Sequence, residues 1–173
     1  MTDGTTGPAG DAGVREPWHA RSGEGPRIDV DAMGIDMRLV VPEAASAGDF
    51  CLLREETVPG GGPPLHVHHR QTELFIVQDG DYEFAAGERR FRAGPGDVVV
   101  VPPGTPHTFR NAGVTKASFL FLLTPALGGD RFFREFAAML RGEGGPPDPA
   151  ALNAMAAPYG LEFVGPPLGA AHG

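Results

Sequence analysis

The most informative stretch of the 173-residue sequence reads GGGPPLHVHHRQTELFIVQDG and covers residues 60–80. His66 and His68 stand two residues apart on a segment that we expect to be extended, so both side chains project from the same face. Glu73 follows at the start of the next apolar run. By itself, a His-x-His pair in a β protein is more often exposed to solvent than bound to a metal. The interpretation of the pair therefore depends on the residues around it.

A second stretch supplies the remaining candidate. Residues 96–111 read GDVVVVPPGTPHTFRN, and His107 follows a segment rich in proline. Prolines restrict the backbone, which lowers the entropic cost of ordering the segment that presents His107. Three neutral imidazoles and the carboxylate of Glu73 suit a first-row divalent metal ion. The two stretches together predict a metal centre with coordination positions left open to a substrate.

The spacing of these residues closely resembles the two motifs of the cupin superfamily. The first motif (Gly, five residues, His-x-His, three or four residues, Glu, six residues, Gly) matches at Gly60, His66, His68, Glu73 and Gly80. The second (Gly, five residues, Pro-x-Gly, two residues, His, three residues, Asn) matches at Gly96, Pro102, Gly104, His107 and Asn111. The resemblance implies an all-β fold, the cupin double-stranded β-helix or jelly-roll barrel. It also implies that one divalent ion (Fe, Ni, Mn, Co or Zn) is held by His66, His68, Glu73 and His107.

The composition agrees with a β fold. The chain holds 26 Gly and 18 Pro, and in a helix interior each Gly costs about 1 kcal/mol and each Pro about 3 kcal/mol, which argues against a helical bundle. Short β-like runs separated by turn signals indicate a sandwich or barrel. The predicted strands are Asp36–Val41, Asp49–Val58, Glu73–Gln78, Asp81–Ala85, Arg89–Arg92, Asp97–Val101, Pro106–Asn111 and Lys116–Thr124.

The two ends of the chain differ from this body. Residues 1–26 are polar and rich in Gly, and we expect a flexible arm there, followed by the barrel over residues 27–127. Residues 128–173 should form a C-terminal extension with two short helices. The first helix is predicted over Asp130–Arg141, and the second over residues 148–157, with Asp148 as N-cap and a proline after it. An apolar piece at residues 161–164 could then return to the body.

Alternation along the predicted strands indicates which side chains face the interior. Side chains two residues apart on a strand share a face, so Phe75 and Val77 should point inward with Glu73, and Phe109 should point inward with His107. We expect these three apolar side chains to line a substrate pocket with the metal at its base. Two strand segments, Val98–Val101 and Phe119–Leu123, are apolar at consecutive positions, so a core should cover one of their faces and a helix or a partner subunit the other. The family resemblance implies a homodimer.

Other candidates have simpler interpretations. Cys51 is expected to pack in a strand as a small hydrophobic residue. Tyr82 could donate a proton. His69, next to His68, should face away from the centre. Three arginines could anchor an anionic substrate, although charges on strand surfaces are the commoner use: Arg54, Arg92 and Arg110.

Charge and cysteine content narrow the function classes. The chain has 14 basic and 22 acidic residues, a net charge of −8, so nucleic acids and anionic membranes are poor partners. A single cysteine excludes an internal disulfide and suits a reducing compartment. The longest apolar run, Phe119–Leu123, is far shorter than the ~20 residues that span a membrane. We therefore expect a cytoplasmic protein that acts on a small molecule.

The resemblance also indicates a type of chemistry. A barrel followed by two short helices looks like the bacterial single-domain cupins similar to quercetin dioxygenases. That likeness implies an oxidoreductase, a metal-dependent dioxygenase that uses O₂ on a hydroxylated aromatic or enolic molecule, with Glu73 as both ligand and catalytic proton acceptor. A redox-neutral alternative keeps the metal and isomerises, cyclises, dehydrates or decarboxylates its substrate. A third alternative is a non-catalytic cupin that binds a small ligand.

Overall fold

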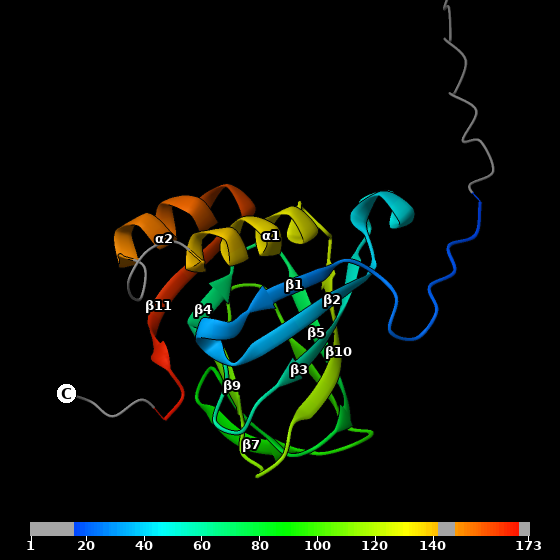
Figure 1. Cartoon of the computed structure of the whole chain (residues 1–173). Coiled ribbons are helices and arrows are strands. Elements are labelled where there is room, and N and C mark those ends of the chain that lie inside the picture. Colours follow the sequence, from blue (N-terminus) through cyan, green and yellow to red (C-terminus); the bar gives the residue numbers. More distant parts are fainter. Residues whose placement is uncertain (1–15, 142–147, 170–173) are drawn as a thin grey trace, which may run out of the picture.

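The computed structural model describes residues 16–141 and 148–169, and two antiparallel sheets face each other in it (Figure 1). Sheet A has the strand order β1 (Arg27–Val30), β2 (Ile35–Val41), β3 (Cys51–Thr57), β10 (Ala117–Thr124), β5 (Thr72–Asp79) and β8 (Val98–Val101). Sheet B has the order β11 (Leu161–Pro167), β4 (Pro64–His68), β9 (His107–Asn111), β6 (Tyr82–Ala86) and β7 (Arg89–Ala93). The all-β jelly-roll barrel predicted from the sequence is confirmed.

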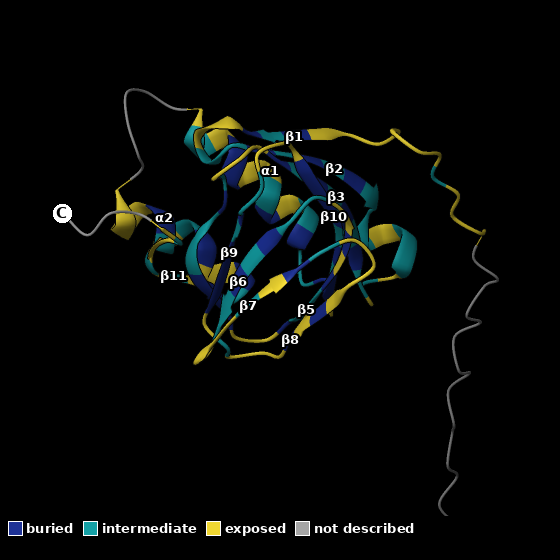
Figure 2. Cartoon of the chain, turned by 90° about the horizontal axis from the view of Figure 1, so that it is seen from below, coloured by how far each residue is buried: buried dark blue, intermediate teal, exposed yellow. Residues whose placement is uncertain are grey.

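Alternation along the strands places one face of each sheet in a shared core. In β3, which reads CLLREET, every second residue from Cys51 to Thr57 is buried and the residues between them are only partly covered. Figure 2 shows a similar change between buried and less buried positions along β2 and β5. Aromatic rings fill the space between the sheets, and Phe75 contacts Phe84 and Phe119 with ring centroids 5.2 and 5.1 Å away. These edge-to-face pairs are a favoured arrangement of buried rings.

Two glycines of the first motif region hold the strands close together. Gly80 has a φ of +83°, a conformation that side chains rarely adopt, and it packs against Ala117 at the start of β10. Gly62 lies against the backbone of Phe109 in β9, where a Cβ atom would overlap the carbonyl oxygen. Glycine is therefore needed at both positions, once for a turn and once for a close approach.

Two α-helices lie together at one end of the barrel (Figure 1). The helix α1 (Gly129–Leu140) buries Phe132 and Phe136, and α2 (Pro149–Ala156) begins at Asp148, whose carboxylate accepts a hydrogen bond from the Ala151 amide at 3.3 Å. Both predicted helices are confirmed, and so is the Asp-Pro start of the second. Three short 3₁₀ helices were not predicted: η1 (Asp31–Met33), η2 (Glu43–Ser46) and η3 (Ala157–Tyr159).

The C-terminal segment returns to the barrel after the helices. The predicted apolar piece at residues 161–164 is part of the longer strand β11, which pairs antiparallel with β4. Of the expected arm at residues 1–26, residues 1–15 lie outside the described residues. Trp18 is among the described residues of this segment, and its Nε1 donates a hydrogen bond to the carbonyl oxygen of Val40 at 2.9 Å. The division of the chain into an arm, a barrel and an extension at residues 27 and 128 stays a prediction. Strand β11, which lies in the predicted extension, is part of sheet B.

The prediction that a helix could cover the outer face of β8 is wrong. Val99 and Val101 are buried, but Val98 and Val100 on the other face are 57% and 55% exposed. The two helices pack against β1 and β11 at the end of the barrel instead. In Phe119–Leu123 the three inward residues are buried, whereas the two leucines between them are half-buried. Within the described residues, no helix has the length and apolar character needed to cross a membrane.

Candidate metal centre

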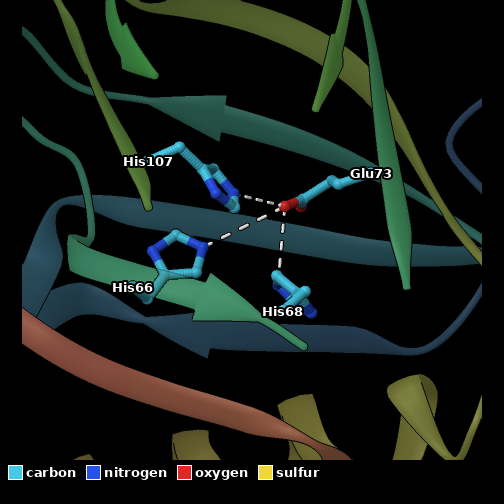
Figure 3. Close-up of side chains that lie close together, drawn as sticks. All are labelled: His66, His68, Glu73 and His107. Carbon is cyan, nitrogen blue, oxygen red and sulfur yellow. Dashed lines mark hydrogen bonds and ion pairs between the residues drawn. The ribbon is translucent and has the colours of Figure 1, made fainter. Parts of the chain in front are cut away.

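Four side chains from both sheets converge between them (Figure 3). His66 on β4 and His107 on β9 are direct partners in the register of sheet B, and His68 lies two residues further along β4. Glu73 approaches from β5 in sheet A, on the opposite side. One ligand atom from each residue lies within 4.8 Å of all the others, and all four residues are buried. The structure thus brings together the four residues that the two motifs single out.

The carboxylate of Glu73 lies at the middle of this cluster. Its Oε2 atom is 2.8 Å from Nε2 of His107, 3.4 Å from Nε2 of His68 and 4.0 Å from Nε2 of His66 (Figure 3). All three imidazoles therefore present the same ring nitrogen to one oxygen.

The opposite ring nitrogens fix the tautomers. Nδ1 of His66 is 2.8 Å from the carbonyl oxygen of Pro64, and Nδ1 of His107 is 2.9 Å from that of Thr105. A carbonyl oxygen only accepts, so in both residues Nδ1 carries the hydrogen and a neutral ring leaves Nε2 with a lone pair. The lone pairs of these Nε2 atoms then point toward a carboxylate oxygen. Lone pairs repel one another at this distance, so the arrangement needs a positive charge between them. A proton can supply that charge, and the donor set of three imidazoles and one carboxylate also fits a divalent metal ion.

The pKa values of the cluster reflect burial and mutual charges. Burial lowers the pKa of His66 to about 3, and the neighbouring histidines add to the effect. Burial alone would raise the pKa of Glu73, but the charges of the surrounding histidines outweigh it and lower this pKa to about 2. For His107, burial is outweighed by the hydrogen bond and the charge of Glu73, which raise the pKa. Without a metal, a proton taken up by the cluster therefore lies on Nε2 of His107, which donates it in a hydrogen bond to Oε2 of Glu73.

Gln71 orients the remaining histidine and was not predicted from the sequence. Its Oε1 atom lies 2.9 Å from Nδ1 of His68. Its Nε2 donates to the carbonyl oxygens of Pro125 and Ala126 at 3.1 and 2.7 Å, which shows which end of the amide faces the histidine. The residue is buried, in the loop between β4 and β5. A loop glutamine gives no recognisable signal, because its role depends on the position of the turn after β10.

An apolar cavity adjoins the centre. It is partly open to solvent and is lined almost entirely by apolar side chains. Phe75 and Phe109 line it, as the alternation predicts, whereas Val77 is buried in the core and is not among the lining residues. Sequence reasoning missed the contribution of the C-terminal segment, whose aromatic rings form part of the lining: Phe132, Phe133 and Phe136 of α1 and Phe163 of β11.

A second carboxyl group, that of Glu55 on β3, also lines the cavity. The residue is 4% exposed, like Glu73, and its Oε1 accepts a hydrogen bond from the Thr57 hydroxyl at 2.8 Å. Burial raises its pKa to about 8. The sequence contained a signal for it, because Glu55 shares the inward parity of Leu53 and Thr57 in β3. A glutamate at an inward position of a strand requires a specific explanation.

The other candidates lie away from the centre. The thiol of Cys51 is buried, which raises its pKa to about 12 and leaves it protonated. His69 faces outward and pairs with Glu162 at 3.0 Å. None of the three candidate arginines lines the cavity; each forms an ion pair with a nearby acidic residue: Arg54 with Glu56, Arg92 with Asp81, and Arg110 with Glu83.

Sequence comparisons identify related proteins. Residues 53–123 match the family model of the cupin domain. The quercetin 2,3-dioxygenase of Bacillus subtilis is 36% identical over 95 residues, which cover 54% of this chain and 27% of that protein. An uncharacterized protein of Methanocaldococcus jannaschii is 32% identical over 62 residues, 35% of this chain and 50% of that one. The matched region thus spans half or less of either curated relative.

Comparison with solved structures agrees on the fold. KdgF from Halomonas sp. superposes with a TM-score of 0.55 at 23% identity, over 61% of this chain and 93% of that chain. A structure described as a predicted oxalate decarboxylase from Thermotoga maritima superposes with a TM-score of 0.58 at 22% identity, over 62% and 98% of the two chains. At these identities the likeness establishes the jelly-roll fold alone.

Proposed function

Because this chain belongs to the cupin superfamily through its domain at residues 53–123, we propose that it is a metal-dependent enzyme, a dioxygenase of hydroxylated aromatic or enolic small molecules. The observation that carries the proposal is the closed set of three imidazoles and one carboxylate at the edge of an apolar cavity. The similarity to a quercetin 2,3-dioxygenase supports the choice of reaction.

Each residue of the centre has a role in this proposal. His66, His68, Glu73 and His107 would hold one divalent ion (Fe, Ni, Mn, Co or Zn). Such an ion would bind a substrate oxygen and favour its anionic form, which prepares the molecule for O₂. Glu73 would accept the hydroxyl proton of the substrate at a carboxylate oxygen. The phenylalanine rings would hold the apolar substrate and exclude water from it.

Oxygen consumption tests this function. The protein would be loaded separately with each of the five metals, and O₂ uptake measured with flavonols and with β-diketones. We expect uptake with at least one metal, and its loss in Glu73→Gln. The variant Glu56→Gln changes an exposed carboxylate on the outer face of β3 and should behave as the wild type. Stoichiometric metal binding without uptake for any combination would refute the dioxygenase.

A redox-neutral reaction is the second candidate, and the two carboxyl groups of the cavity favour it. Glu73 is ionised and Glu55 is neutral at pH 7, so one could accept a proton while the other donates one. Such a pair suits an isomerase, cyclase, dehydratase or decarboxylase. Turnover of a substrate under strictly anaerobic conditions would establish this alternative. Tight ligand binding without turnover in air or without it would instead indicate a binding protein.

The outer face of sheet A supports a homodimer. The strand register aligns two rows of apolar side chains across β10, β5 and β8, namely Leu120, Ile76 and Val98 in one row and Leu122, Leu74 and Val100 in the other. A second copy of the chain would remove this contiguous surface from water. Sedimentation velocity should show a dimer that Val98→Lys converts to a monomer. Val114→Lys, at an isolated position that is 94% exposed, should leave the dimer intact, and a monomeric wild type would refute it.

A further inference from the structure

Glu55 is a buried carboxyl group that no cation faces within residues 16–141 and 148–169. Across the strands that flank β3, its register partners are Met37 on β2 and Phe119 on β10, both apolar. Its sequence neighbours Arg54 and Glu56 project from the other face of the sheet, where they pair with each other at 3.3 Å. On the inward face, the described titratable groups that act on Glu55 are Glu73 of the metal centre and Tyr82, whose hydroxyl contacts Thr57.

The hydrogen bonds around Glu55 determine where its proton lies. The Thr57 hydroxyl donates its one hydrogen to Oε1 of Glu55, so it accepts at its other contact, with the Tyr82 hydroxyl at 3.0 Å. The order is therefore Tyr82 to Thr57 to Glu55. Among the described residues, Oε2 of Glu55 has no hydrogen-bond partner. Because the residue lines the cavity, this oxygen is available to a bound molecule. In the neutral acid, Oε1 is then the carbonyl oxygen, and Oε2 carries the hydrogen toward the cavity.

The two glutamates belong to different parts of one cavity. Strand β10 lies between β3 and β5, with Phe119 opposite Glu55 and Leu123 opposite Glu73. Glu55 and Glu73 are therefore offset by four residues along the strands and by two strands across the sheet. These offsets separate their Cα atoms by about 13 Å along the sheet and about 10 Å across it. Glu55 is thus too far away to be a ligand of the centre. Apart from Glu55, the polar side chains among the described lining residues are those of the centre itself: His66, His68 and Glu73.

We propose that Glu55 is a specificity residue that donates a hydrogen bond from Oε2 to a second, uncharged acceptor oxygen of the substrate bound at the metal centre. The proposal rests on the proposed function for the position of the substrate. The ligand class is an aromatic or otherwise apolar molecule with two separated oxygen functions. One oxygen binds the centre, and the other is a carbonyl or ether oxygen near Glu55. A molecule that presents an anionic group there is rejected, because the apolar wall offers that charge no counter-ion.

The protonation state gives this role a pH limit. Burial raises the pKa of Glu55 to about 8, and the charge of Glu73 adds to it against the hydrogen bond from Thr57. The neutral donor is therefore present below pH 8 and is lost above it. A glutamine at this position also donates a hydrogen bond but does not titrate in this range. Leucine neither donates a hydrogen bond nor titrates. Comparing glutamate, glutamine and leucine at position 55 therefore separates the effect of hydrogen-bond donation from the effect of titration.

Anaerobic binding of flavonols to the metal-loaded protein tests the proposal. The probes are 3-hydroxyflavone and its derivatives with one methoxy group on an outer ring, which adds one acceptor oxygen. We expect at least one derivative to bind the wild type more tightly than the parent by about fivefold to tenfold, the effect of one hydrogen bond. The preference should fall above pH 8 in the wild type, persist there in Glu55→Gln, and be absent in Glu55→Leu. Glu56→Gln is the matched control and should keep the wild-type profile.

Infrared spectroscopy provides a readout that needs no substrate. A carbonyl band of a protonated carboxyl group should be present at pH 7 in the wild type and in Glu56→Gln, and absent in Glu55→Gln. Lack of that band would overturn the proposal, as would equal methoxy preferences in the wild type and Glu55→Leu. Where Glu55→Leu does not fold, a wild-type preference that is unchanged from pH 7 to 9 would have the same meaning. Failure of every flavonol to bind a fully loaded protein would instead refute the flavonol-like substrate, and with it the substrate contact at Glu55. Binding without O₂ uptake would refute only the dioxygenase.

Discussion

Glu55 and Glu73 are the same residue type, are both 4% exposed and line one cavity, yet their pKa values move in opposite directions. Three imidazoles surround Glu73, and their charges lower its pKa to about 2 in spite of its burial. Glu55 has only a hydroxyl donor and apolar neighbours, so burial decides and its pKa rises to about 8. At neutral pH one end of the cavity therefore carries a carboxylate and the other a carboxylic acid. Burial alone thus does not fix the charge of a buried acid; the groups that face it do.

The largest expected effect comes from the same substitution at the two positions. Glu73→Gln removes the negative charge that balances a divalent ion, so we expect the affinity for metal to fall by more than about 100-fold, beyond the loss typical of an outer partner. Glu55→Gln should leave metal affinity unchanged. Elemental analysis and competition with a chelator measure both. Equal losses of metal affinity in the two variants would contradict the assignment of Glu73, and not Glu55, as a metal ligand.

The next effect concerns the residue that orients His68. Gln71→Leu removes the hydrogen bond to Nδ1 but leaves all four proposed ligands in place. We expect metal affinity to fall about 10-fold to 100-fold, as for other partners of ligating histidines. Gln71→Glu can accept from the same Nδ1 and should recover part of the loss. Unchanged affinity in Gln71→Leu, with the fold intact by circular dichroism, would show that His68 needs no such support.

Acidification should weaken metal binding by a smaller amount. The hydrogen bond and the charge of Glu73 raise the pKa of His107, so a proton competes with the metal for this imidazole as the pH falls. Once the pH is below that pKa, the apparent affinity should decrease about tenfold per pH unit. Calorimetric titration in buffers of different ionisation enthalpy measures the number of protons released. A value near zero at pH 6, which is below the raised pKa, would contradict a proton held by His107 in the metal-free cluster.

The smallest expected effect is the dependence of stability on Glu55. Its folded pKa of about 8 lies above the ordinary value of 4.5, so the folded state holds the extra proton. Its contribution to stability is complete below pH 4.5 and is lost as the pH rises through 8. Between pH 7 and 9 the wild type should lose about 1.4 kcal/mol more than Glu55→Gln in urea unfolding. Equal losses would show that Glu55 is already ionised at pH 7.

The sequence predicted the parts of the molecule that rest on local spacing. The two motifs indicated the jelly roll, and the Asp148-Pro149 pair indicated where α2 begins. His66, His68, Glu73 and His107 could be singled out because their spacing is fixed within short segments. The structure brings their side chains together as that spacing implied.

Other features depend on contacts between distant segments, which spacing does not report. Gln71 binds the turn after β10, more than 50 residues away in the sequence. The aromatic rings of α1 form a regular helical stripe, but only the position of the helix at the barrel end makes Phe133 part of the cavity. Val98 and Val100 looked like buried residues, because an apolar run does not show whether a single chain covers both faces of its strand. Glu55 was predictable from parity in β3 and was overlooked.

The pairing of β11 has a consequence for how the protein is made. His66 and His68 lie on β4, whose register with β9 is a single pair, His66 with His107, whereas β11 pairs with β4 along its whole length. During synthesis the ribosome adds residues from the N-terminus, so β4 leaves it nearly 100 residues before β11 does. Until Pro167 has emerged, the histidine-bearing strand lacks its principal neighbour. The centre, whose last candidate ligand is His107, is thus completed only after the 60 further residues up to Pro167 have been translated.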